Sequence, residues 1–388
     1  MAWMCEMLSK RLSRIEESAT IRMAHIAKQL QDNGKGILNF SLGEPDFKTP
    51  EHICEAAKQA LDIGYTHYTS SAGVDELREE IAKKIHKENK LDITMENVIV
   101  TPGAKQAIYE LMMSVLDEGD EVILLDPAWV SFEQAVKLAG GSPKWVKRVE
   151  EAVKYESLEA AVSDNTKMLI LNSPNNPGGY VLSEREQREI ADFAIEHDLI
   201  VLSDEIYEKI LYGRKHVSIA SFDGMQERTA VINGFSKEYA MTGWRIGYAV
   251  APTEITKGML KIQQHSVTCA PSISQFAALA GLRSSQNCVQ EMVSEFKKRR
   301  DVIVKRLNDM GLQCVNPEGA FYAFINTSGH GGDVEFTERL LKEAYIVVTP
   351  GSAFGLAGKN YVRLSFAASM ESILEGMDRI EKLVSYLR

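Results

Sequence analysis

Residues 167–207 read KMLILNSPNNPGGYVLSEREQREIADFAIEHDLIVLSDEIY. The apolar runs at 167–171 and 199–202 predict two strands, and the segment 184–196 between them predicts a helix with its apolar residues on one face. Apolar, β-branched runs that do not alternate with polar residues are typical of strands buried on both faces. Such strands joined by a helix predict parallel β-α-β units and therefore an α/β fold.

The same alternation continues on both sides of this stretch. Further strands are predicted at 97–101, 122–125, 229–232 and 246–250, and further helices at 19–33, 105–116 and 132–138. After about residue 285 the pattern changes to a long charged helix at 288–310, strand-like pieces at 320–325, 346–348 and 361–366, and a last helix at 373–386. The sequence therefore predicts a large α/β domain and a smaller α+β domain.

The composition excludes several classes of protein. The 388 residues carry a formal net charge of −10, which is a poor match for a nucleic-acid binder but compatible with a local basic pocket for one small anion. No apolar run approaches the roughly 20 residues of a membrane-spanning helix, and the N-terminus lacks the apolar segment of a signal peptide. We therefore expect a cytoplasmic protein without a membrane partner. The five cysteines show no metal-binding spacing, so free buried thiols are expected and no metal.

One loop holds a candidate nucleophile. The stretch 233–248, NGFSKEYAMTGWRIGY, follows a predicted strand and contains Lys237, with Arg245 eight positions later. A lysine that is partly desolvated beside another cation has a lowered pKa, and the neutral amine is the form that a Schiff-base nucleophile requires. A solvated surface lysine is the ordinary alternative for such a residue taken alone.

Other candidates follow other predicted strands. They are Asp204 and Tyr207 in SDEIY, Asn176 in NSPNNPGG, Trp129 in DPAW, and Gly103, Ala104 and Lys105 in TPGAKQ. Taken singly, each has a structural explanation: a helix N-cap for Asp204, a turn former for Asn176, a core residue for Trp129, and a plain strand-to-helix turn for 103–105, although such a turn also suits an anion. Because α/β proteins bind ligands at the carboxyl ends of their strands, we expect these groups to converge.

Three further residues carry a weaker signal. Arg363 interrupts an apolar strand in YVRLS, and an inward arginine would need an acidic partner such as a substrate carboxylate. A surface arginine on an alternating strand is the alternative. Tyr68, in THYTS, could be a half-buried packing residue, and Gly43, in LGEPD, could belong to an ordinary turn.

Taken together, the motifs resemble those of the class I aminotransferases of pyridoxal-phosphate fold type I, and most of all the prokaryotic aspartate and aromatic aminotransferases. They occur in the family's order over almost the whole chain: SLGEPDF, THYTSSAGVDELRE, TPGAKQA, SPNNPGG, SDEIY, NGFSKEYAMTGWRIGY, EGAFYAF, TPGSAFG and YVRLSF. The resemblance implies a three-layer large domain at 49–287 that binds pyridoxal phosphate, a small domain at 288–388, and an N-terminal segment at 1–48 that packs with the small domain and at the active-site entrance. It also implies a homodimer with shared active sites.

The resemblance implies a role for each candidate. Lys237 would bind the cofactor covalently and later carry the proton, Asp204 would pair with the pyridine nitrogen, and Tyr207 and Asn176 would bond the phenolic oxygen. Trp129 would stack on the ring. The phosphate would be held by Gly103, Ala104, Lys105, Ser236 and Arg245, with Tyr68 of the neighbouring subunit. On the substrate side, Arg363 would grip the α-carboxylate with Gly43 closing over it, and Trp129, Asn176 and Lys105 would also contact the substrate.

The implied reaction is ping-pong transamination between an amino acid and a 2-oxo acid. Lys105 favours L-aspartate and 2-oxoglutarate, because some prokaryotic aspartate enzymes of this family use a lysine there for the acidic side chain, whereas aromatic enzymes often have asparagine. Two features depart from the family: Gly234 stands where many aspartate enzymes have serine, and the arginine that animal-type enzymes use for the distal carboxylate has no recognisable counterpart. The alternatives are an aromatic or broad-specificity aminotransferase, a relative that catalyses β-elimination or acts on alanine, and a non-catalytic protein of the same fold.

Overall fold

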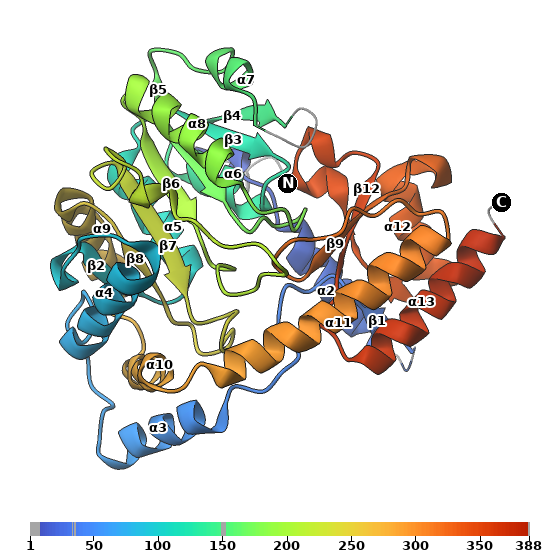
Figure 1. The fold of residues 1–388 in the computed structure, drawn as a ribbon, viewed down its shortest axis with the longest axis horizontal. Helices are drawn as coiled ribbons and strands as arrows, with labels where there is room; N and C mark the ends of the chain where they lie inside the picture. The colour runs from blue at the N-terminus through green and yellow to red at the C-terminus, as the bar shows by residue number, and fades with distance from the viewer. Residues whose placement is uncertain (1–7, 33, 35, 149–152, 387–388) are drawn as a thin grey trace.

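A seven-stranded sheet forms the centre of the larger part of the molecule (Figure 1). The structure, a computed structural model, describes residues 8–32, 34, 36–148 and 153–386. In spatial order the strands are β2 (Val98–Thr101), β8 (Gly247–Val250), β7 (Thr229–Gly234), β6 (Ile200–Asp204), β5 (Thr166–Asn172), β3 (Glu121–Asp126) and β4 (Ser142–Lys147). The pairs β7–β6, β6–β5, β5–β3 and β3–β4 are parallel, which confirms the predicted α/β fold with a mostly parallel sheet.

Two strands differ from the prediction. β8 runs antiparallel to both β7 and β2, because the connection at 235–246 contains no crossover helix and so returns the chain directly. β4 has no counterpart in the sequence prediction. Among the described strands it pairs only with β3, at the edge of the sheet, and its sequence SPKWVK mixes polar and apolar residues as an edge strand allows.

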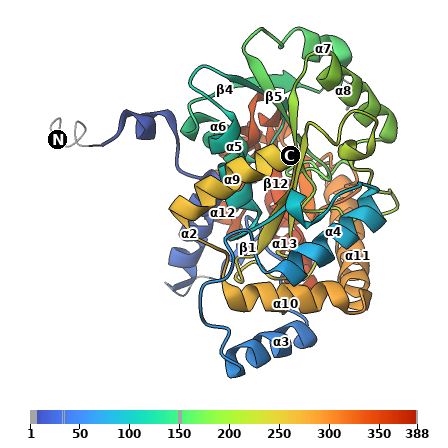
Figure 2. The same ribbon diagram turned by 90° about the vertical axis from the view of Figure 1, so that its left-hand side faces the viewer.

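Helices cover both faces of this sheet, as Figures 1 and 2 show. One face packs against α5 (Ala104–Val115), α6 (Val130–Leu138) and α9 (Thr253–Ser266). The other packs against α3 (Glu51–Asp62), α4 (Asp75–Asn89), α7 (Tyr155–Glu159), α8 (Glu184–Glu196) and α10 (Ser272–Arg283). Because side chains alternate along a strand, Ile99 joins the first core while Val98 and Val100 join the second. The result is a three-layer arrangement.

The C-terminal part builds a second core. After the long helix α11 (Asn287–Asp309), it contains β9 (Tyr322–Asn326), α12 (Gly332–Glu343), β10 (Ile346–Val347), β11 (Thr349–Pro350), β12 (Tyr361–Ser365) and α13 (Met370–Ser385). A three-stranded sheet has the order β11-β12-β9. The predicted strand at 346–348 corresponds to β10, and the next short strand, β11, belongs to a different sheet.

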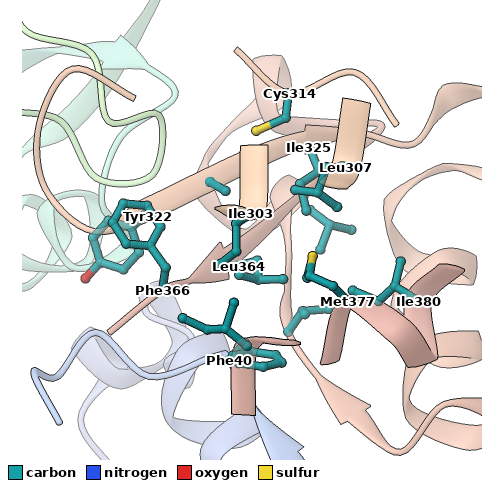
Figure 3. Packing of buried hydrophobic residues seen from close by; sticks show 14 of the residues in the cluster. Phe40, Ile303, Leu307, Cys314, Tyr322, Ile325, Leu364, Phe366, Met377 and Ile380 are labelled. Carbon is teal, nitrogen blue, oxygen red and sulfur yellow. The ribbon is translucent and has the colours of Figure 1, made fainter. Parts of the chain in front are cut away.

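The N-terminal segment contributes to this second core. β1 (Leu38–Asn39), which follows α2 (Ala19–Asp32), pairs in parallel with β10. Phe40 is 1% exposed and packs among C-terminal residues such as Leu364 and Met377 (Figure 3). A Cβ atom on Gly376 would lie 2.5 Å from the Phe40 ring, so α13 needs a glycine there for the ring to approach. Residues 38–40 therefore belong to the same core as the C-terminal part.

The described residues also contain short 3₁₀ helices. These are η1 (Lys10–Arg14), η2 (Met95–Asn97), η3 (Ile219–Ser221), η4 (Ser328–His330), η5 (Gly351–Phe354) and η6 (Leu356–Gly358). No helix in the described residues combines the length and apolar character that crossing a membrane requires.

The described cysteines are free, but only Cys314 is buried, whereas Cys54, Cys269 and Cys288 are half-buried. Cys5 lies outside the described residues.

Candidate active site

A pocket of about 230 Å³ lies at the carboxyl edge of the parallel strands. It brings together most of the residues that the sequence singled out: Gly43, Ala104, Lys105, Trp129, Asn176, Asp204, Tyr207, Ser236, Lys237, Arg245 and Arg363. The parallel strands β3, β5, β6 and β7 all end at this edge, so the residues after them meet although they are far apart in the chain. Gly103 lies beside the pocket at the start of α5. Tyr68 lies outside it and is 85% exposed.

Lys237 is the amine of the pocket. It follows β7, and its Nζ donates a hydrogen bond to the backbone carbonyl of Gly43. Burial lowers the pKa of Lys237 to about 8, with Glu44 acting in the opposite direction and the cations of Arg363 and Arg245 adding to the decrease. The neutral amine, which is the form that a nucleophile needs, is therefore far more populated near neutral pH than for an ordinary lysine.

Asp204 is the carboxyl group of the pocket. It is the last residue of β6, directly opposite Asn172 of β5, whose Nδ2 donates to the Asp204 carbonyl at 3.1 Å. The backbone N–H of Ile206 donates to Oδ1 at 3.1 Å. Burial raises the pKa of Asp204 to about 7. No helix follows, since residues 206–209 form a turn, so the alternative of a helix N-cap does not apply and the carboxyl group is available to a ligand.

Arg363 lies deep in the pocket. It is 2% exposed, in the middle of β12, which excludes the alternative of a surface arginine. Its Nη1 donates to Asn176 Oδ1 at 2.9 Å, and Nη2 donates to the Ser41 carbonyl and, at 3.5 Å, to Thr349 Oγ1. All of these acceptors are neutral, and Nε is buried without a partner. A buried cation that lacks a counter-ion is costly, so this arrangement suits a ligand carboxylate.

Two tyrosines line the pocket beside Arg363. Tyr207 Oη and Tyr322 Oη are hydrogen-bonded at 2.7 Å, and the Arg363 guanidinium stacks 4.5 Å from the centre of the Tyr322 ring. Tyr322 was not predicted as a site residue, although it belongs to the EGAFYAF motif. A Cβ atom on Gly43 would lie 2.2 Å from Tyr322 Oη. That close approach is a physical reason for a glycine at 43.

An anion cup forms where α5 begins. Gly103 has φ +86, and a Cβ atom there would lie 2.5 Å from Arg245 Nη2. The first N–H groups of a helix have no partner within the helix and attract anions. Arg245, held by hydrogen bonds to the carbonyls of Thr242 (2.9 Å) and Pro102 (3.3 Å), adds a positive charge, and Ser236 adds a hydroxyl at the pocket wall.

Trp129 and Lys105 form another wall of the pocket. Trp129 precedes α6, and Lys105 Nζ lies 4.9 Å from the centre of its ring. Trp129 is half-buried and faces the pocket, so it is not simply a core residue. The lining is completed by five residues that the sequence did not indicate: Thr20, Ile108, Asn172, Ile206 and Thr242. Their residue types carry no chemical signal in the sequence, except for Asn172, which directly follows a predicted strand.

Residues 35–380 match the sequence model of the family described as "Aminotransferase class I and II". The chain belongs to this family. The aminotransferase is 46% identical to the aspartate aminotransferase of Pyrococcus abyssi and 45% identical to aromatic-amino-acid aminotransferase 2 of Thermococcus litoralis, in both cases over 97% of this chain and 98% of the relative. The aspartate aminotransferase of Thermus thermophilus, solved with maleate, superimposes with a TM-score of 0.93 at 41% identity, covering 97% of this chain and 99% of the other.

The cofactor of this aminotransferase is pyridoxal phosphate, and the pocket fits it. The buried amine of Lys237 matches its aldehyde, and the cup of Gly103 and Arg245, which a side chain at 103 would fill, matches its phosphate. The buried carboxyl group of Asp204 suits a pyridine nitrogen, because a protonated ring would supply the counter-charge that burial denies it. The prediction of a pyridoxal-phosphate-dependent transaminase is confirmed.

Proposed function

We propose that this aminotransferase transfers the amino group of L-aspartate to 2-oxoglutarate by a ping-pong mechanism and produces oxaloacetate and L-glutamate. The observation that carries the proposal is the presence of two cations with different surroundings in one pocket. Arg363 is buried among neutral acceptors, and Lys105 stands over Trp129 at the pocket wall. Two cations suit the two carboxylates of a dicarboxylic substrate. The Pyrococcus relative is named for aspartate, and the Thermus relative was solved with maleate, a four-carbon dicarboxylate.

In this proposal, each residue of the pocket has a separate chemical role. Bound pyridoxal phosphate supplies the electron sink for the electrons left when the substrate loses its Cα proton. Lys237 Nζ takes up that proton as a general base, for which a pKa of about 8 is well matched. Asp204 would hold a proton on the ring nitrogen, and Tyr207 and Asn176 would donate to the phenolic oxygen. Arg363 orients the α-carboxylate of the amino acid and of the oxo acid.

We also propose that two chains form a homodimer with shared sites. Tyr68 is 85% exposed and lies outside the pocket of its own chain. In a dimer with shared sites it would reach the phosphate held by the partner. We further propose that residues 1–48 and 288–388 form a small domain against 49–287, which the pairing of β1 with β10 and the burial of Phe40 support.

The experiment is a survey of amino donors with purified enzyme and 2-oxoglutarate. We expect kcat/KM for aspartate to exceed the value for every other donor, apart from glutamate with oxaloacetate in the reverse direction. A kcat/KM for phenylalanine or alanine that is about tenfold or more above the aspartate value would overturn the aspartate assignment.

Aromatic or broad specificity is the second candidate. The Thermococcus relative, named for aromatic amino acids, is 45% identical to this chain, against 46% for the aspartate relative. One observation favours it: the rings of Trp129 and Tyr322 line the pocket together with the two cations, so the pocket wall is partly aromatic. The same survey separates the two candidates.

A further inference from the structure

Three residues of the proposed site are each followed directly by a glutamate. The pairs are Asp204–Glu205, Tyr207–Glu208 and Lys237–Glu238. The three glutamates are 1%, 7% and 5% exposed, in that order, and none of them lines the pocket. Buried carboxyl groups are uncommon unless they are paired. Their position beside three site residues therefore needs a physical explanation.

Glu208 is held by three donors from two other elements. Lys84 of α4 forms an ion pair with Glu208 Oε1 and also donates to Asn89 Oδ1 at 3.1 Å. Asn233 Nδ2, at the end of β7, donates to Glu208 Oε1 at 2.8 Å, and Asn89 Nδ2 donates to Oε2 at 3.2 Å. The same Asn89 Nδ2 lies 2.9 Å from Glu205 Oε2 and so joins the two carboxylates.

Glu205 completes the cluster. It accepts hydrogen bonds from Ser203 Oγ at 2.9 Å and Ser218 Oγ at 2.6 Å, and its Oε2 lies 2.8 Å from His216 Nε2. The ligand atoms of three side chains, Glu205, Glu208 and His216, lie close enough together to hold a metal ion. However, every carboxylate oxygen of the two glutamates already accepts a hydrogen bond from the protein. The cluster is therefore a hydrogen-bond network that fixes these side chains, and not a cation site.

The charges of the cluster are balanced inside the protein. The side chains of Lys84 and Glu208 are 9% and 6% exposed, so their ion pair is shielded from water. The Lys84 and His216 cations lower the pKa of Glu208 to about 2 against the effect of burial. Burial and the charge of Glu208 raise the pKa of Glu238 to about 8, so Glu238 is largely neutral near pH 7. Lys84, which also pairs with Glu88 at 3.3 Å, is thus the permanent cation in direct contact with Glu208, and Lys209 acts on Glu208 from a greater distance.

The turn that carries Tyr207 is held on one side by the core, where Tyr207 and Ile210 are 4% and 1% exposed, and by the hydrogen bond between Tyr207 and Tyr322. Residues 206–209 form no helix, and the backbone hydrogen bonds of this turn are Glu208 N to Glu205 O at 2.9 Å and Ile210 N to Tyr207 O at 2.8 Å. Side-chain contacts therefore place the turn on two sides, with Tyr207 and Ile210 in the core and Glu208 bound to α4 and β7. Asn233 connects the same hydrogen-bond network to the end of β7. Its Oδ1 also accepts a hydrogen bond from the backbone N–H of Gly234 at 2.7 Å, and Gly234 lies three residues before Lys237.

We propose that Lys84 and Glu208 are positioning residues, whose buried ion pair holds the turn after β6 so that Asp204 and Tyr207 meet the bound cofactor in the reactive geometry. The inference rests on the proposed function, in which Asp204 and Tyr207 contact pyridoxal phosphate. It assigns a role in the reaction to a pair of residues that never touches the substrate or the cofactor.

The test compares three forms of the cofactor-loaded enzyme: wild type, the single variant Lys84→Met, and the double variant Lys84→Met/Glu208→Gln. The single variant leaves a buried carboxylate without its cation and should lose thermal stability. The double variant removes both charges, so its Tm should return toward the wild-type value. The matched control is Lys257→Met/Glu254→Gln, which removes an exposed ion pair of α9 and should leave all readouts unchanged.

The kinetics of the double variant distinguish an ion pair that only stabilises the fold from one that also positions site residues. Rates are normalised to folded, cofactor-bound protein. For a positioning pair we expect kcat about tenfold below wild type, KM within about twofold of wild type, and a shift in the pH at which the visible absorbance of the bound cofactor changes. Wild-type kcat together with a wild-type absorbance profile would overturn the inference.

A further variant covers the case in which the double variant does not fold. Glu208→Asp keeps the counter-charge of Lys84 but withdraws the carboxylate by one methylene group, so we expect a smaller change in the same two readouts, and wild-type values would overturn the inference. Wild-type enzyme that binds pyridoxal phosphate but transaminates no amino acid would instead contradict the proposed function, which keeps the two failures distinguishable.

Discussion

Arg363 and Asn176 are 187 residues apart in the chain, yet Arg363 Nη1 donates to Asn176 Oδ1 at 2.9 Å. The bond joins β12 of the C-terminal part to the turn after β5, so it connects the two cores across the pocket. Arg363 still has a buried Nε without a partner. The guanidinium is therefore held in place by neutral groups and keeps donors for a ligand carboxylate.

Replacing Arg363 tests this role. Arg363→Ala should raise KM about a hundredfold for every amino donor and for 2-oxoglutarate, because all of these substrates share the carboxylate next to the reacting carbon. Steady-state kinetics with several donors measures the effect. Arg339→Ala, at an ion pair on the surface of α12, is the control and should behave as wild type. A loss confined to acidic substrates would contradict the assignment.

Replacing Lys237 tests the nucleophile. Lys237→Ala should abolish the visible absorbance of covalently bound cofactor and lower kcat by at least about a hundredfold, since a general base is lost together with the covalent link. Absorbance spectra and single-turnover rates check both effects. Lys257→Ala removes an exposed lysine and serves as the control. Normal turnover by Lys237→Ala would show that the amine has been assigned wrongly.

Asp204 should make the cofactor-free protein less stable as the pH rises. Its pKa is raised to about 7 in the folded chain from a reference value of 3.8, so between these values the folded state binds more protons than the unfolded state. The free energy of unfolding should therefore decrease with pH over this window.

The variant Asp204→Asn removes that dependence. In the cofactor-free form it should be more stable than wild type at pH 8, and the difference should shrink toward pH 4. Urea unfolding at several pH values measures it, and a difference that is independent of pH would contradict the cause we give. The same variant should bind cofactor but react slowly, because a neutral amide cannot balance a proton on the ring nitrogen. The Asp204 carboxyl group therefore lowers the stability of the cofactor-free protein while it is needed for the reaction.

Much of the pocket could be predicted from the sequence, because many of its residues lie at the carboxyl ends of parallel strands. The segment 184–196 was predicted as a helix with the bounds that it has, and the capping box of Ser183 and Glu186 fixes its start. Asp204, Asn176 and Lys237 follow parallel strands, so a correct strand pattern is enough to bring them together.

What the sequence could not reveal depends on contacts between distant residues. The Tyr207–Tyr322 bond spans 115 positions, and the ion pair of Lys84 with Glu208 spans 124. No local pattern indicates that the two residues of either pair are in contact. The direction of β8 also escaped prediction, because an apolar run has the same appearance in parallel and antiparallel pairs.

Lys105 should set the preference for the substrate side chain. Lys105→Asn removes the cation at the Trp129 wall, so kcat/KM for aspartate should decrease by about tenfold or more, while the value for phenylalanine should stay the same or increase. The ratio of the two constants is the measurement, because it cancels any general loss of cofactor. Lys137→Asn, at a partly exposed ion pair of α6, is the control. An unchanged ratio would remove Lys105 from substrate recognition and favour the aromatic candidate.

Tyr68 should act in the site of the neighbouring chain. Tyr68→Phe removes one hydrogen bond to an anion and should weaken cofactor binding by about tenfold. The stronger test mixes this variant with Lys237→Ala and isolates the mixed dimer. In a shared-site dimer, one site then contains Lys237 of one chain and Tyr68 of the other, and it should bind cofactor with wild-type affinity, whereas the second site lacks both residues. A mixed dimer whose reactive site keeps the weakened affinity would show that Tyr68 acts within its own chain.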